Sequence, residues 1–205
     1  MKNLLFLISL ALLITNCSKP KHTYEESIKQ FQYELNTQYA DAEESPLTKE
    51  DLPTFKSLDF FEIDKSYQIE AELELTPESP IFEMQTTTDR LPLYKKYGIA
   101  HFTINGQTCS LSLYESQNFQ NALDHENLLF VPYNDLSNGK TSYSGGRFID
   151  IEIPSAGSKT IIIDFNKSYN PYCAYNHKYS CPIPPSENNL PVAIPVGVKS
   201  YGKHH

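Results

Sequence analysis

The segment GIAHFTINGQTCSLSLY, residues 98–114, decides the fold class of this chain. Apolar and polar side chains alternate along both halves of the segment, and Asn105-Gly106 separates the halves. Asn-Gly is favoured where a two-residue hairpin turn needs positive φ at both positions. The segment therefore predicts an antiparallel β-hairpin with one apolar face. That face would consist of Ala100, Phe102, Ile104, Cys109, Leu111 and Leu113.

Alternating patterns continue on both sides of this hairpin. In residues 67–75 every odd position is apolar and every even position is polar, which is typical of a strand with one face in water. Further strands are predicted at 81–86, 128–133, 147–153 and 160–166, and the segment PSAGS at 154–158 is predicted to join the last two as a hairpin connector. No crossover helix separates the strands. We therefore expect a mainly β fold, either an antiparallel β-sandwich or a partly closed barrel.

One helix and one irregular segment complete the predicted domain. Apolar residues recur at 24, 28, 31 and 35, which predicts an amphipathic N-terminal helix over 24–40. The β domain would then occupy residues 41–201. Its last part holds prolines at 171, 182, 184, 185, 191 and 195 and follows no regular period, so it is predicted to be a C-terminal strap across the sheet.

The N-terminus has the pattern of an export signal. Lys2 precedes an apolar run at 4–14 that is too short to span a bilayer as a helix. The run ends in LITNC at 13–17, which resembles the lipobox of bacterial lipoproteins, with Asn16 in place of the usual small residue. We expect a signal peptide over 1–16, acylation of Cys17 by fatty acids such as palmitate, a tether over 17–23 and anchorage to a bacterial membrane. The alternative is an ordinary secretory signal in which Cys17 has no role.

Composition excludes several classes of protein. The 205 residues include 25 acidic and 17 basic residues, with a net charge of −8, which argues against nucleic acid as a partner. Hydrophobic residues make up 40% of the chain, which argues against a disordered chain. No complete metal or cofactor motif is present, so no cofactor is expected.

Four spaced blocks in the second half of the chain resemble the DUF1684 family, a domain of unknown function. The blocks are LFVPY (129–133), NGKTSYSGGRFID (138–150), DFNKSYNPYCAYN (164–176) and CPIPPSENNL (181–190). The resemblance extends from residue 45 to residue 197. It implies a bacterial protein, often a lipoprotein or a cytosolic protein, and it implies no particular reaction.

Polar residues of the glycine-rich loop and the strap make up the candidate binding site. Glycines allow a backbone to approach a ligand, and Arg147 offers fixed donors to an anion. The alternative for Arg147 is a structural ion pair with Asp150 or Asp164. The candidate ligand-binding residues are Tyr143, Arg147, Asn170, Tyr175, Asn176 and Glu187. The expected partner is a small polar or anionic ligand, or a protein of the cell envelope.

Cys173 and Cys181 leave three alternatives open. Export to an oxidising compartment favours a disulfide between them. With His177 they could also bind a metal, although a fourth ligand is not evident. A reactive thiol would need a histidine as base. The alternative function is thus a hydrolase-type enzyme that uses Cys173 or Glu187 with a histidine, and no known catalytic motif supports it.

Overall fold

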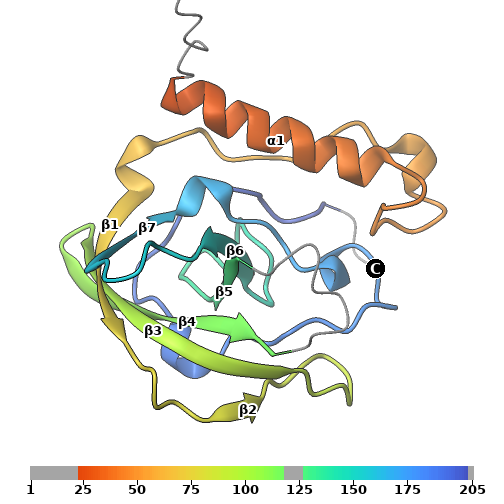
Figure 1. Ribbon diagram of the computed structural model, residues 1–205. Coiled ribbons are helices and arrows are strands. Elements are labelled where there is room, and N and C mark those ends of the chain that lie inside the picture. The colour runs from red at the N-terminus through yellow and green to blue at the C-terminus, as the bar shows by residue number, and fades with distance from the viewer. Residues whose placement is uncertain (1–22, 118–126, 203–205) are drawn as a thin grey trace, which may run out of the picture.

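The computed structural model describes residues 23–117 and 127–202, so the predicted signal segment and Cys17 lie outside the described residues. The fold is mainly antiparallel β, in which one sheet curls into a half-barrel (Figure 1). The strands in chain order are β1 (Gln68–Leu75), β2 (Ile81–Glu83), β3 (Leu93–Ile104), β4 (Gln107–Ser116), β5 (Leu128–Tyr133), β6 (Arg147–Glu152) and β7 (Thr160–Asp164). Their order across the sheet is β6-β5-β4-β3-β1-β7, and β2 pairs with β3.

The predicted hairpin is confirmed as β3 and β4. Asn105 has a φ of 50° and Gly106 a φ of 74°, so both turn residues are left-handed, as the Asn-Gly pair predicts. Ile104 pairs with Gln107 and Phe102 with Cys109 across the two strands. All six side chains predicted for the apolar face are at most 7% exposed. The hairpin therefore supplies much of the inner wall of the half-barrel.

The segment predicted as a hairpin connector between β6 and β7 does not join neighbouring strands. The two strands lie at opposite ends of the sheet, and β7 pairs with β1 instead. Because the sheet curls, its two ends come close, and a short link spans the gap between them. The architecture is thus the partly closed barrel rather than the two-sheet sandwich.

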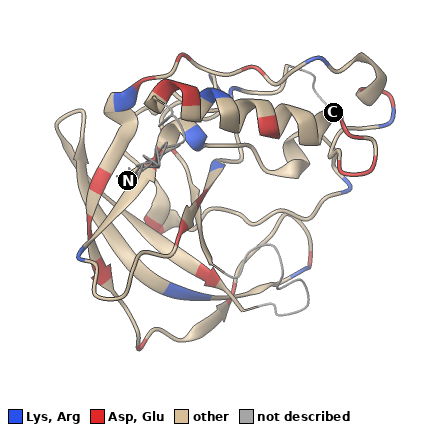
Figure 2. Ribbon diagram, turned by 45° about the horizontal axis from the view of Figure 1, so that its top comes forward, with Lys and Arg blue, Asp and Glu red and all other residues tan. Residues whose placement is uncertain are grey.

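The α-helix of the described residues, α1 (Tyr24–Ala40), runs across the top of the curled sheet in Figure 1. It begins with a capping box, in which Thr23 and Glu26 each bond the other's backbone N–H. The Tyr24 hydroxyl donates to Asp164 Oδ1 at 2.9 Å and accepts from Asn166 Nδ2 at 2.8 Å, which ties the start of α1 to the end of β7. Acidic residues lie on both the helix and the strands (Figure 2). Within the described residues, no helix has the length and apolar character needed to cross a membrane.

Short 3₁₀ turns and extended segments make up the rest. The turns are η1 (Leu52–Thr54), η2 (Lys65–Tyr67), η4 (Phe165–Lys167), η5 (Tyr172–Ala174) and η6 (Ser186–Asn188). In the strap, Leu190, Val192, Ile194 and Val196 alternate into the core of the half-barrel, and each is at most 7% exposed. Pro191 and Pro195 lie between them, and their missing N–H groups keep this extended segment from forming a regular ladder.

Candidate functional site

A cavity of about 470 Å³ lies between α1, the strap and the outer face of the sheet. Its size falls in the range of small-molecule sites, roughly 300–1,000 Å³. Its wall is largely aromatic. The aromatic residues that line it are Phe31, Tyr39, Tyr94, Phe130, Phe148, Tyr169, Tyr172 and Tyr179.

Strand alternation explains why aromatic rings stand at this outer face. Leu129 and Val131 of β5 point into the main core, so Phe130 between them points the other way. Phe148 of β6 packs edge-on against Phe130, with ring centroids 4.8 Å apart. Tyr94 of β3 adds a third ring, 5.5 Å from Phe130. This face of the sheet is therefore a rigid aromatic surface, covered by the strap and α1.

Among the described residues, the charged side chains that line the cavity are those of Arg90, before β3, and Asp150, on β6. The exposed Arg90 donates from Nη2 to the Ser180 carbonyl at 2.6 Å and from Nε to Ser180 Oγ at 3.1 Å. Asp150 Oδ2 accepts from the Tyr169 hydroxyl at 2.6 Å. Burial and the Asp150 carboxylate hold the pKa of Tyr169 well above its ordinary value. Tyr169 therefore stays protonated, and its hydroxyl acts as the hydrogen-bond donor to Asp150. In the part of the chain that the structure describes, the cavity thus combines a largely aromatic wall with the exposed guanidinium of Arg90.

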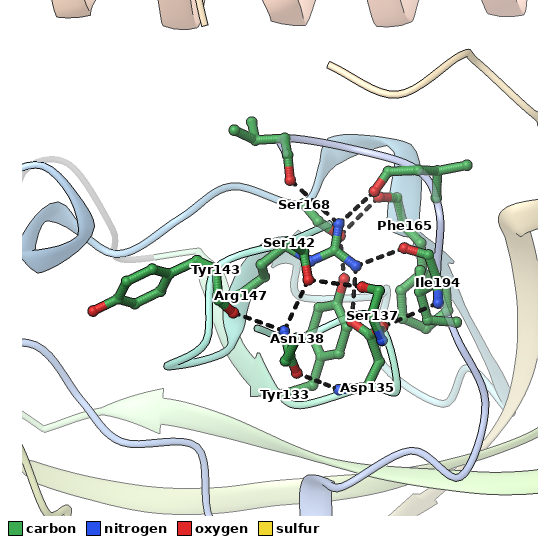
Figure 3. Close-up of polar contacts among 12 residues, drawn as sticks. Tyr133, Asp135, Ser137, Asn138, Ser142, Tyr143, Arg147, Phe165, Ser168 and Ile194 are labelled. Atoms are coloured by element: carbon green, nitrogen blue, oxygen red, sulfur yellow. Dashed lines mark hydrogen bonds and ion pairs between the residues drawn. The ribbon is translucent and has the colours of Figure 1, made fainter. Parts of the chain in front are cut away.

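Arg147 lies elsewhere, and it is not available to a ligand. Its side chain is fully buried, and Nη2 donates to Asp135 Oδ2 at 2.8 Å and to the Ile194 carbonyl at 2.7 Å (Figure 3). Nη1 donates to the Val196 carbonyl at 2.5 Å. This burial gives no support to the ligand role predicted for Arg147, and its ion-pair partner is Asp135 rather than the predicted Asp150 or Asp164. Arg147 shares the core-facing side of β6 with Ile149 and Ile151, and this alternation could have signalled its burial.

The glycine-rich loop packs closely against the strap at Gly146. Gly146 has a φ of 89°, and a Cβ there would lie 2.6 Å from Pro184 Cγ and 2.8 Å from the Tyr133 carbonyl oxygen. The Asn138 side chain also stabilises the loop by a hydrogen bond inside it, because its Nδ2 donates to the Tyr143 carbonyl at 2.9 Å (Figure 3). Gly146 therefore allows the close packing of this loop on the strap.

The other predicted ligand residues do not form one patch. Asn170 and Tyr175 are fully buried, and Asn170 Nδ2 donates to the Tyr175 hydroxyl at 3.2 Å and to the Lys199 carbonyl at 2.8 Å. Tyr143 is half-buried, with its hydroxyl 3.9 Å from Cys173 Sγ. Asn176 accepts a hydrogen bond from the Lys178 N–H in a short turn. None of these four residues lines the aromatic cavity.

Glu187, in η6 of the strap, binds side chains of β3 and β4. Its Oε1 accepts from the Tyr114 hydroxyl at 2.7 Å and forms an ion pair with Lys96 Nζ at 2.8 Å. Burial acts to raise the pKa of Glu187, but the hydrogen bonds from Lys96, Tyr114 and Ser112 outweigh it and lower the pKa to about 2. Such a carboxylate is a poor general base, and no histidine is among these partners in the described residues. The geometry gives no support to an enzyme that uses Glu187.

Cys173 and Cys181 are adjacent, but they are free thiols rather than a disulfide in the structure. The Cys173 N–H donates to Cys181 Sγ at 3.1 Å. The hydrogen bond with Cys181 is the main cause that lowers the pKa of Cys173 to about 7, and His177 contributes weakly. Within residues 23–117 and 127–202, no group of three or more His, Cys, Asp or Glu residues could hold a metal ion. The metal alternative for Cys173, His177 and Cys181 therefore has no geometric support.

In a comparison with protein families, residues 53–199 match the proteins of unknown function DUF1684. The chain belongs to the DUF1684 family. A similar fold is found among solved structures, in an uncharacterized protein of Haloarcula marismortui studied by solution NMR. It is 28% identical, with a TM-score of 0.70, and the similarity covers 88% of this chain and 96% of that protein. No curated protein matches the chain.

The DUF1684 segment contains most of the cavity wall, including Arg90, Asp150 and the strap, whereas α1 precedes the segment. The sequence patterns did not predict this cavity. A signal for it was present, because Phe130 and Phe148 occupy the positions of β5 and β6 where a wet strand face would carry polar residues. Strands that are apolar on both faces are covered on both sides.

Proposed function

We propose that this DUF1684 protein is a cell-envelope lipoprotein that binds a small organic molecule in the aromatic cavity. The ligand class that suits the cavity is a ring-containing, apolar body that carries an anionic group. The observation that carries the proposal is the cavity itself, about 470 Å³ of space lined by aromatic rings with one exposed arginine. Such rings bury a flat ligand with little loss of side-chain freedom, because they already pack on one another.

Arg90 supports the anionic part of the proposal. Its guanidinium is held at the cavity by two hydrogen bonds to Ser180, so little freedom is lost when it binds an anion. Asp150, the other charged residue of the wall, already accepts a hydrogen bond from Tyr169. A carboxylate, sulfonate or phosphate on the ligand would therefore be oriented toward Arg90.

The envelope part of the proposal rests on the N-terminal sequence. After cleavage before Cys17, five residues (18–22) would separate the acylated Cys17 from Thr23, where α1 is capped. The six Cα–Cα steps from Cys17 to Thr23 span at most about 20 Å when extended. The cavity wall formed by α1 would then be held close to the membrane surface.

The test uses two fluorescent probes of nearly the same shape. 1-Anilinonaphthalene-8-sulfonate is an aromatic anion, and N-phenyl-1-naphthylamine is its neutral counterpart. We expect saturable binding of both probes to the wild-type protein. Phe130→Ala should lower the affinity of the protein for both probes, because it removes a ring from the cavity wall. Arg90→Gln should lower the affinity for the sulfonate probe roughly 10-fold or more, because the sulfonate binds the guanidinium. The affinity for the neutral probe should stay unchanged.

Matched controls are available outside the cavity. Tyr33→Ala removes an exposed ring from α1, and Lys140→Gln removes an exposed cation from the loop before β6. Neither should change the affinity for either probe, and amide shifts in ¹⁵N NMR spectra should map the probes to Tyr94 and Ser180. Equal affinities for wild type, Phe130→Ala and Arg90→Gln, or shifts confined to another surface, would refute the proposal.

A further inference from the structure

We infer that Cys173 and Cys181 are a redox pair whose disulfide fixes one wall of the aromatic cavity and thereby raises its affinity for ligand. This inference rests on the proposed function for its effect on ligand affinity, but the disulfide and its effect on the wall can be measured without any ligand. It goes beyond a structural disulfide, because it assigns the bond a regulatory role.

The first support is the placement of the two thiols. Cys173 and Cys181 are 8% and 5% exposed, and the Cys181 sulfur already accepts a hydrogen bond from the Cys173 N–H at 3.1 Å. The two side chains thus lie together in one buried place, although eight positions separate them in the sequence. Bond formation needs a local adjustment rather than a rearrangement of the fold. Cys109, the remaining described cysteine, is buried in the separate core of the half-barrel.

The second support is the connection from Cys181 to the cavity. Cys181 lines the cavity together with Tyr179 and Ser180. Its backbone pairs with Thr87, because the Thr87 N–H donates to the Cys181 carbonyl at 2.9 Å and the Cys181 N–H donates to Thr87 Oγ1 at 3.1 Å. Ser180, next to Cys181, accepts both hydrogen bonds from Arg90. A bond that restrains Cys181 therefore also restrains the segment that holds Arg90.

The chemistry is thiol–disulfide exchange with a small disulfide oxidant such as oxidised glutathione. The Cys173 thiolate attacks one sulfur of the oxidant, whose S–S bond breaks, and one thiolate leaves. Cys181 then loses its proton to solvent, and its thiolate attacks Cys173 Sγ and displaces the second thiolate. Two protein thiols are oxidised, and one disulfide is reduced to two thiols. Cys173 suits the attacking role, because its pKa lies near 7 whereas that of Cys181 is raised by the hydrogen bond with Cys173 and by burial.

The experiment compares the protein equilibrated with oxidised glutathione and with dithiothreitol. Peptide mapping without reduction should show a bond between Cys173 and Cys181 after oxidation and a free thiol at Cys109. Without any probe, oxidation should shift the amide resonances of Thr87 and Arg90. The oxidised protein should bind 1-anilinonaphthalene-8-sulfonate at least about threefold more tightly, because a restrained wall loses less freedom on binding. Cys181→Ser should abolish these differences, and Cys109→Ala should retain them.

Each negative result has a separate meaning. If no bond between Cys173 and Cys181 forms at any glutathione ratio, the inference is overturned whether or not the cavity binds a probe. If the bond forms but neither the resonances nor the affinity change, the regulatory role is overturned and the proposed function stands. If neither redox form binds either fluorescent probe, the proposed function fails and, with it, control of ligand affinity. The resonances of Thr87 and Arg90 then still decide whether the bond fixes the wall.

Discussion

At the scale of single residues, Arg147 joins parts of the chain that are distant in sequence. Its guanidinium bonds Asp135 in the preceding loop and the carbonyls of Ile194 and Val196 in the strap. Asp135 in turn accepts from the Ile194 N–H at 3.1 Å, so both partners of the ion pair also bind the strap. The planar fork of arginine suits several carbonyl acceptors at once, which a lysine ammonium would match poorly.

Arg147→Met should therefore destabilise the fold without altering the cavity. It leaves the buried Asp135 carboxylate without its cation, and we expect the free energy of unfolding to fall by about 3–5 kcal/mol. Urea unfolding followed by far-UV circular dichroism measures this change. Lys140 is an exposed residue of the same loop, and the free energy of unfolding of Lys140→Met should stay within about 0.5 kcal/mol of the wild-type value. Arg147 would be a ligand residue after all if Arg147→Met kept its stability and lost the binding of the anionic probe.

At the scale of secondary-structure elements, the weak point of the sheet lies between β4 and β5. Their ladder consists of one pair, Tyr114 with Phe130, and Pro132 of β5 has no N–H to extend it. The side chain of Asn188 in η6 fills the place of the missing ladder. It accepts from the Ser112 N–H at 2.7 Å and donates to the carbonyls of Ser112 at 3.0 Å and Pro132 at 2.7 Å. The strap thus completes the sheet as well as covering it.

Asn188→Ala should uncouple these two strands. It leaves three buried backbone groups without their partner, and we expect a loss of about 3 kcal/mol in the free energy of unfolding. Amide hydrogen exchange at Ser112 should speed up more than exchange in the β3–β4 hairpin. Asn189→Ala, at the exposed neighbouring residue, is the matched control. It should lower the free energy of unfolding by less than about 1 kcal/mol. Equal losses for the two variants would mean that the amide of Asn188 does not bridge the sheet.

At the scale of the whole molecule, two apolar clusters are present in the described residues. One fills the half-barrel, and the other joins Tyr39 of α1 to Leu58, Tyr175 and Val198. The cavity is bordered by α1 and the strap on one side and by the sheet on the other. A lipid anchor shortly before α1 would hold all three at the membrane through that helix.

The anchor itself is tested with Cys17→Ala. We expect wild-type protein to incorporate a fatty-acid analogue in bacterial cells and to sediment with membranes, because acyl chains bury apolar surface in the bilayer. Cys17→Ala should lose the label and leave the membrane fraction, whereas Ser18→Ala should behave as wild type. Equal labelling of wild type and Cys17→Ala would show that Cys17 is not the acylated residue.

The elements of this fold follow from local patterns, because a strand or turn depends on residues close together in the chain. The period of two and the Asn-Gly pair predict the β3–β4 hairpin with its buried face, and the apolar spacing before residue 40 predicts a helix. The proline content after residue 170 predicts an irregular strap. The family resemblance likewise depends on spaced blocks that the sequence displays directly.

What only the tertiary structure decided are the partners of the polar residues and the place of the cavity. Arg147 meets a carbonyl 47 residues away, and Asp150 meets a tyrosine 19 residues away. No local pattern encodes such distances, because they depend on how far the sheet curls and where the strap crosses it. The same curl brings β6 and β7 close together, although they lie at opposite ends of the sheet, so that a short link joins them. The sequence by itself therefore determined the strands, the helix and the strap, whereas their packing determined which arginine is buried and which one faces a cavity.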